Sequence, residues 1–239
     1  MKPIVKTIIW LSIFSVAMGY LESSVVVYLR KIYYPEGFRF PLTPVSKDIA
    51  TTEFWREVAT IFMLISAGVM AGKNATQRFA FFIYSFAIWD IFYYIFLKVL
   101  LAWPESLFTW DILFLIPVPW VSPVMAPCII SLTMIVLTLL IICNQEKEEY
   151  IHINFIEWIF LVFGSITIII SFMWDYIQYL VTNGTEKVVW TLSAKNDLFA
   201  EIKNYVPQNF NWCLFGVGEG IICLAMLLIF KRIRRTKNE

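Results

Sequence analysis

The sequence predicts an all-α integral membrane protein with six transmembrane helices. Apolar residues make up 59% of the chain and charged residues only 15%, whereas soluble domains carry about 25% charged residues. The apolar residues also gather in blocks of about twenty, the length of helix that crosses the hydrocarbon core of a bilayer. We therefore expect residues 1–239 to form a single helical domain surrounded by the lipid bilayer.

The expected spans follow one another along the chain with polar loops between them. They cover residues 7–28, 54–72, 79–101, 124–143, 155–181 and 211–230. The first span begins after two lysines, and the alternative interpretation is a signal peptide that is cleaved near the small residues at 17–19. Its apolar run continues to Leu29, which is longer than the usual apolar core of a signal peptide and favours a retained helix.

The stretch 103–143 does not fit one straight span, because as a single helix it would measure roughly 60 Å. Prolines at positions 117, 119, 123 and 127 interrupt it, and each removes a backbone donor. We expect a short helix near 105–116, either re-entrant or interfacial, which the prolines separate from the fourth span. Non-helical backbone at membrane depth must be buried in protein or line a wet cavity, so this break is a candidate part of a binding site. A full crossing, with seven spans in total, is the alternative.

The basic residues predict how the chain is oriented. Five of the seven residues 231–237 are Lys or Arg, and such clusters mark the cytoplasmic side of a membrane. Six spans then place both termini in the cytoplasm, with the chain in the cell membrane. The loops near 30–53 and 182–210 lie outside in this arrangement, and residues 195–203 of the second loop have the pattern of a short amphipathic helix.

Ionisable residues inside the spans are the candidate functional residues, because a charge in hydrocarbon is costly. The candidate binding residues are the six carboxylates Glu22, Glu57, Asp90, Asp111, Asp175 and Glu219, with Arg56, Lys98, Tyr93 and Tyr94 as partners. In the six-span arrangement all the carboxylates lie at the midplane or in the outer half, with Glu22 about 9 Å and Asp90 about 16 Å from the outer helix ends. We expect them to form an acidic chamber open to the outside; the alternative is that they pair as buried contacts between helices.

Several kinds of chemistry have no counterpart in the sequence. His152 is the only histidine, which excludes multi-histidine metal sites and bis-histidine haem ligation. No P-loop, GxGxxG, HExxH or nucleophile elbow is present, and the four cysteines show no disulfide or metal-ligand spacing. The net charge of +1 argues against a nucleic-acid partner. We therefore expect no cofactor, no bound metal ion and no nucleic acid.

The leading functional hypothesis is a small transporter or permease for a cation or a cationic solute, rather than an enzyme. Glu22, Asp90 and Glu219 would carry the site, and a carboxylate without a neighbouring cation would also take up a proton and couple transport to protons. One alternative is a membrane enzyme that acts on a lipid or isoprenoid, with a carboxylate as general acid or base. The other is a non-catalytic subunit whose charges pair with a partner membrane protein or with a second copy of the chain.

Overall fold

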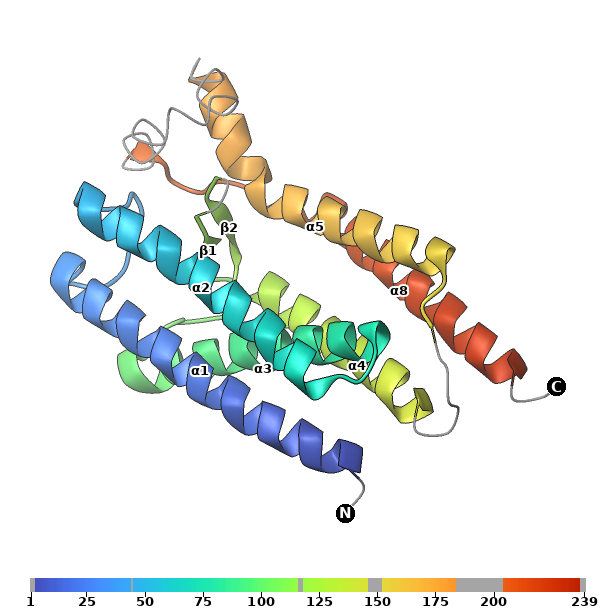
Figure 1. Cartoon of the computed structure of the whole chain (residues 1–239). Helices are drawn as coiled ribbons and strands as arrows, with labels where there is room; N and C mark the ends of the chain where they lie inside the picture. The colour runs from blue at the N-terminus through green and yellow to red at the C-terminus, as the bar shows by residue number, and fades with distance from the viewer. Residues whose placement is uncertain (1–2, 44, 116–117, 146–151, 184–203, 237–239) are drawn as a thin grey trace.

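The computed structural model describes residues 3–43, 45–115, 118–145, 152–183 and 204–236. Six helices in these ranges are long and apolar enough to cross a membrane (Figure 1). They are α1 (Pro3–Tyr33), α2 (Lys47–Ala71), α3 (Ala75–Leu101), α4 (Met125–Gln145), α5 (Phe155–Thr182) and α8 (Trp212–Thr236). The expectation of six apolar helices is therefore confirmed, and each expected span falls on one of them. The amphipathic helix expected over 195–203 lies outside the described residues.

The region before α4 is a β-hairpin, so the expectation of a short helix over 105–116 is wrong and the fold is mostly helical instead of all-α. Strand β1 (Trp110–Phe114) pairs antiparallel with β2 (Trp120–Pro123). The backbone bond from Val124 N to Thr109 O, 3.0 Å long, continues the pairing at the base. Prolines cannot donate within a helix, and the Trp, Ile, Phe and Val residues here favour strands. Cross-strand bonds satisfy backbone groups that a proline-broken helix would leave open.

Glycines allow the helices to approach closely at two crossings on α3. A Cβ on Gly19 of α1 would lie 3.1 Å from Trp89 O. A Cβ on Gly68 of α2 would lie 2.7 Å from Arg78 O. Both distances are shorter than an ordinary van der Waals contact, so only glycine permits these backbone contacts. The face of α3 that remains uncovered by α1 and α2 turns toward α4.

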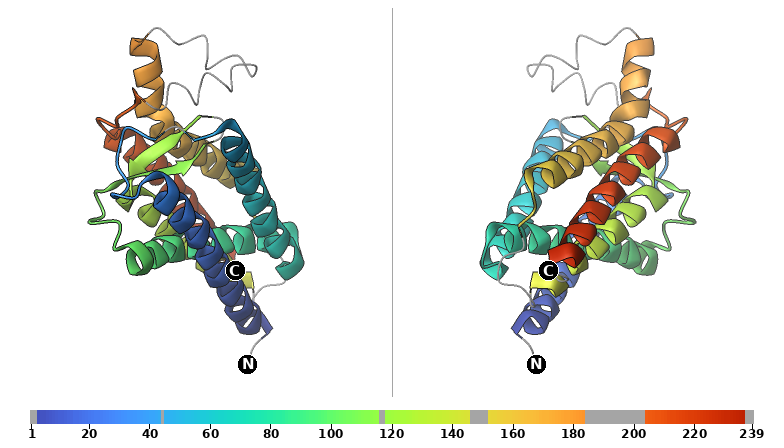
Figure 2. Two further views of the ribbon diagram at one scale, coloured as in Figure 1. Left: turned by 90° about the vertical axis from the view of Figure 1, so that its left-hand side faces the viewer. Right: turned by 90° about the vertical axis from the view of Figure 1, so that its right-hand side faces the viewer.

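The helices enclose a cavity in the middle of the bundle. Figure 1 shows α1 and α2 on one side and α5 and α8 on the other, with α3 and α4 between them. Helix α4 packs against both α3 and α8, and β2 packs against α5 and α4. Both termini lie toward one end of the bundle and the hairpin toward the other, as the views in Figures 1 and 2 agree. The hairpin therefore covers one end of the central space.

Candidate functional site

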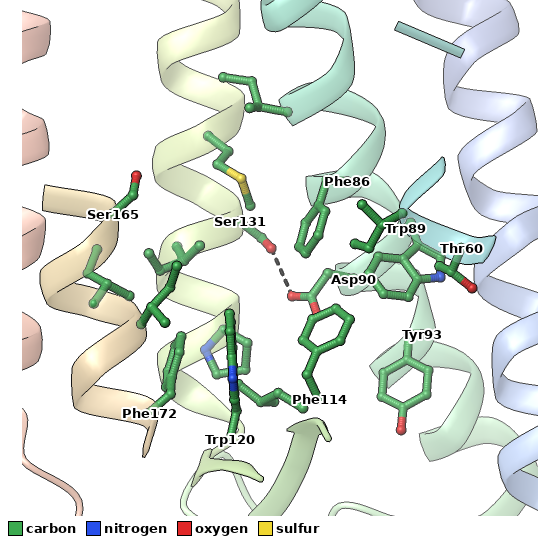
Figure 3. A pocket seen from close by; sticks show the side chains of 18 of the residues that line it. Thr60, Phe86, Trp89, Asp90, Tyr93, Phe114, Trp120, Ser131, Ser165 and Phe172 are labelled. Carbon is green, nitrogen blue, oxygen red and sulfur yellow. Dashed lines mark hydrogen bonds between the residues drawn. The ribbon is translucent and has the colours of Figure 1, made fainter. Parts of the chain in front are cut away.

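The central space is a cavity of about 660 Å³, within the range of about 300–1,000 Å³ that small-molecule sites occupy. Helices α2, α3, α4 and α5 supply most of its walls, α1 and α8 supply a few residues, and the hairpin residues in the lining include Phe114 and Trp120 (Figure 3). Most of the lining side chains are aliphatic or aromatic, and a few polar groups are set among them. This composition is typical of a site for an organic molecule rather than of a water-filled channel.

Helix α3 supplies the centre of the site. It begins at the N-cap Asn74, whose side chain accepts a hydrogen bond of 2.9 Å from Gln77 N. Phe86, Trp89, Asp90 and Tyr93 follow at spacings that place residues on one face of a helix, and all four line the cavity. The regular α-helix therefore carries a single carboxylate into an aromatic wall.

Among the described residues, the side chain of Asp90 has one hydrogen-bond partner, which comes from the opposite wall. The Ser131 hydroxyl of α4 donates to Asp90 Oδ2 at 2.8 Å, and Figure 3 shows this bond among the aromatic rings. Phe114 lies close to Phe86, with ring centroids 6.4 Å apart, and to Trp120, with centroids 5.4 Å apart. Within the described ranges, no Lys or Arg side chain forms an ion pair with Asp90. The carboxylate of Asp90 thus lies among aromatic rings and has no Lys or Arg counter-ion among the described residues.

A second polar group lies at the edge of the cavity, where α1 meets α2. Arg56 Nη1 pairs with Glu22, and Arg56 Nη2 lies 2.7 Å from Glu53 Oε2 one helical turn earlier. Glu57, the next residue, accepts a hydrogen bond of 3.0 Å from Leu115 N at the end of β1. The group has three carboxylates and one guanidinium, and the Glu57 bond attaches the hairpin to α2.

The hairpin is also held from its other side by Asp111 of β1. Arg30 Nη2, at the end of α1, lies 3.4 Å from Asp111 Oδ1. Burial raises the pKa of Asp111 to about 6, and Arg30 opposes this rise. Asp111 is therefore a buried member of an ion pair that fixes the hairpin, and it does not line the cavity.

The remaining expected site residues do not line the cavity and have structural contacts instead. Asp175 accepts hydrogen bonds from Tyr205 Oη (2.6 Å), Gln208 N (3.1 Å) and Asn209 N (3.0 Å), and so ties α5 to the segment before α8. Burial, followed by Asp175, raises the pKa of Tyr205, which keeps the phenol protonated as a donor. Glu219 accepts from the Thr133 hydroxyl at 3.0 Å and links α8 to α4. Lys98 donates to the carbonyl of Pro104 at 2.7 Å.

The residues expected to form the acidic chamber fall into two sets in the structure. The cavity lining includes Glu22, Glu57, Asp90, Arg56, Tyr93 and Tyr94, and it does not include Asp111, Asp175, Glu219 or Lys98. Sequence reasoning missed Ser131 and the aromatic wall. The helical spacing of Phe86 and Trp89 with Asp90 was a usable signal for part of that wall. The hairpin residues gave no such signal while a helix was expected there.

In the described part of the chain, no group of three or more His, Cys, Asp or Glu side chains is placed to hold a metal ion. No protein-family model matches the sequence, and no curated protein and no solved structure matches it. The residues and their geometry are therefore the basis for inferring a function.

Proposed function

We propose that this protein is a membrane transporter for an organic cation that joins an apolar body to a positive charge. The observation that carries the proposal is Asp90, a carboxylate without an ion pair among the described residues, in an aromatic cavity of about 660 Å³. In a site of low dielectric such a carboxylate attracts a positive charge strongly. It therefore supplies both affinity and selectivity for the sign of the charge.

The lining supports an organic cation over an inorganic one. Rings such as Trp89, Phe86 and Phe114 attract a cation through their negative faces and also bury apolar surface. Hard inorganic cations instead take about six to eight oxygen ligands. The single carboxylate and hydroxyl at Asp90 and Ser131 suit the positive group of a larger molecule, whose apolar part would fill the rest of the cavity.

The charges at the cavity edge favour the same class of substrate. Glu22, Glu53 and Arg56 together carry a net charge of −1 when all three are ionised, and Glu57 adds a further carboxylate that faces the cavity. A low-dielectric cleft with one sign of charge raises the local concentration of oppositely charged solutes. Cations would therefore be drawn toward the cavity and anions excluded.

In this proposal the protein has six spans, both termini in the cytoplasm and the hairpin on the outer side. The basic residues of the last turn of α8, Arg234 and Arg235, mark the cytoplasmic end. The hairpin would close the outer end of the cavity, held to α2 by the bond between Glu57 and Leu115 N. Transport then requires the hairpin to move away from the outer end of the cavity, which breaks its contact with α2.

The test is flux of benzyltrimethylammonium, a permanently charged aromatic cation, into liposomes that contain the purified protein. We expect uptake above that of protein-free liposomes, and we expect Asp90→Asn to lower it at least tenfold while leaving the protein folded. Glu36→Gln removes an exposed acidic group that lies outside the cavity and should leave uptake unchanged. Equal uptake by the wild type and Asp90→Asn would contradict the proposal.

A further inference from the structure

A second cavity, of about 550 Å³, lies where α1 and α3 end. Arg30, Lys31 and Tyr34 line it from the end of α1, and Trp103 and Glu105 line it from the segment after α3. It shares no lining residue with the cavity around Asp90. Its most buried charged group is Arg30, whose side chain is only 9% exposed.

The guanidinium of Arg30 is held in a fixed position. Its Cζ lies 4.3 Å from the ring centre of Phe38 and 3.7 Å from that of Trp103, so the guanidinium is held by cation–π contacts with two rings. Nη2 pairs with Asp111. Nη1 is buried and has no hydrogen-bond partner among the described residues. A buried charged donor without an acceptor is costly, so an acceptor that reaches Nη1 from this cavity would relieve that cost.

The neighbouring side chains identify the kind of acceptor. Lys31 brings a second positive charge to the same cavity. The Tyr34 hydroxyl accepts a hydrogen bond of 2.8 Å from Thr43 N, which leaves its own proton available to donate. Burial raises the pKa of Tyr34, so the phenol stays protonated. Two cations and a phenol match an oxyanion with several acceptor oxygens, and arginine and lysine are the usual ligands of phosphate.

We propose that this second cavity binds the phosphate of a membrane lipid headgroup, with Arg30 Nη1, Lys31 and Tyr34 as its donors. Arg30 and Lys31 lie in the last turn of a helix that is apolar enough to span a membrane, the level at which lipid phosphates meet a protein. Glu105 lies in the same lining and suits a headgroup that also carries an ammonium, as in phosphatidylethanolamine. Arg30 can bind the phosphate and Asp111 at the same time, because Nη1 would donate to the phosphate while Nη2 stays paired with Asp111.

The test is native mass spectrometry of the delipidated protein in detergent. Three probes are added separately: phosphatidylethanolamine, inorganic phosphate, and diacylglycerol, which lacks the phosphate. We expect phosphatidylethanolamine to be retained and diacylglycerol not. Arg30→Lys keeps the charge but loses the planar guanidinium, and it should weaken retention of phosphatidylethanolamine at least tenfold. Lys31→Gln, at an exposed position, should weaken this retention severalfold. Lys73→Gln, in the loop between α2 and α3, is the matched control and should leave retention unchanged.

Equal retention of the two lipids, or unchanged retention in both Arg30→Lys and Lys31→Gln, would overturn the proposal. Inorganic phosphate that binds alone with the same dependence on Arg30 and Lys31, while the lipid does not, would overturn the lipid as the source of the phosphate. Asp90→Asn should retain phosphatidylethanolamine as the wild type does, because Asp90 belongs to the other cavity. Failure of the transport proposal and failure of this one are therefore distinguishable.

Discussion

Replacing Gly218 with alanine should force α8 away from α5, because the added methyl group has no room where the two helices cross. A Cβ at this position would lie 2.6 Å from Ile168 Cγ1, 3.0 Å from Gly164 O and 3.1 Å from Ile168 N. Two of these three are backbone atoms, which cannot rotate away. The crossing is reciprocal, since a Cβ on Gly164 would lie 3.0 Å from Gly218 O.

The size of the effect follows from these distances. Carbon atoms in contact lie about 3.5–4.0 Å apart, so the methyl is about 1 Å too close to Ile168 and roughly 0.5 Å too close to the backbone of α5. The side chain of Ile168 can adjust, but the backbone moves only with its helix. Overpacking of this kind costs about 1–3 kcal/mol. For a chain of this size each kcal/mol lowers the unfolding midpoint by about 2–4 °C.

The assay is thermal unfolding in detergent, followed by tryptophan fluorescence. Gly216→Ala is the matched control on the same helix, because nothing lies within 4 Å of a Cβ there. Alanine is favoured over glycine in a helix by about 1 kcal/mol, so the control should be as stable as the wild type or more so. The side chain of Ile168 also lines the cavity around Asp90, and Gly218→Ala should therefore weaken ligand binding too. If Gly218→Ala is as stable as Gly216→Ala, the close crossing is refuted.

Two further predictions concern buried carboxylates. Asp175→Asn removes the charge that accepts bonds from Tyr205, Gln208 N and Asn209 N, and we expect a loss of about 2–4 kcal/mol in unfolding free energy; an unchanged midpoint would contradict this role. Asp111 has its pKa raised from 3.8 to about 6 in the folded state, so its stabilising contribution is fully present below pH 3.8 and is lost as the pH rises through 6. Relative to Asp111→Asn, the wild type should lose about 2 kcal/mol of unfolding free energy between pH 4 and pH 7, measured from the unfolding midpoints of the two proteins. A difference that does not change with pH would contradict the raised pKa of Asp111.

The six helices were predictable because the bilayer sets the length of an apolar span whatever its neighbours are. The hairpin was not, although the prolines correctly marked a break. A run such as Trp110–Phe114 is equally apolar as a helix or as a strand, and its pairing with Trp120–Pro123 depends on contacts across the turn. The hydrophobic period and the length of one segment do not indicate which other segment it contacts.

The candidate site was predictable only in part, for a related reason. The cost of a charge in hydrocarbon pointed to Asp90, and helical spacing gave its face on α3. Spacing along a helix does not give the partner on another helix. Asp111 pairs with Arg30, 81 positions away, and Asp175 is satisfied by a segment about 30 positions later. Carboxylates at similar depth were therefore expected to share one chamber, although the fold separates them.

The most direct test of a cation site at Asp90 is calorimetric titration of the purified protein with two ions of similar size and opposite charge, benzyltrimethylammonium and phenylmethanesulfonate. We expect the cation to bind and the anion not to bind. Asp90→Asn should weaken binding of the cation at least tenfold, which corresponds to about 1.4 kcal/mol. Equal binding of the two ions, or unchanged affinity in Asp90→Asn, would contradict a cation site at Asp90.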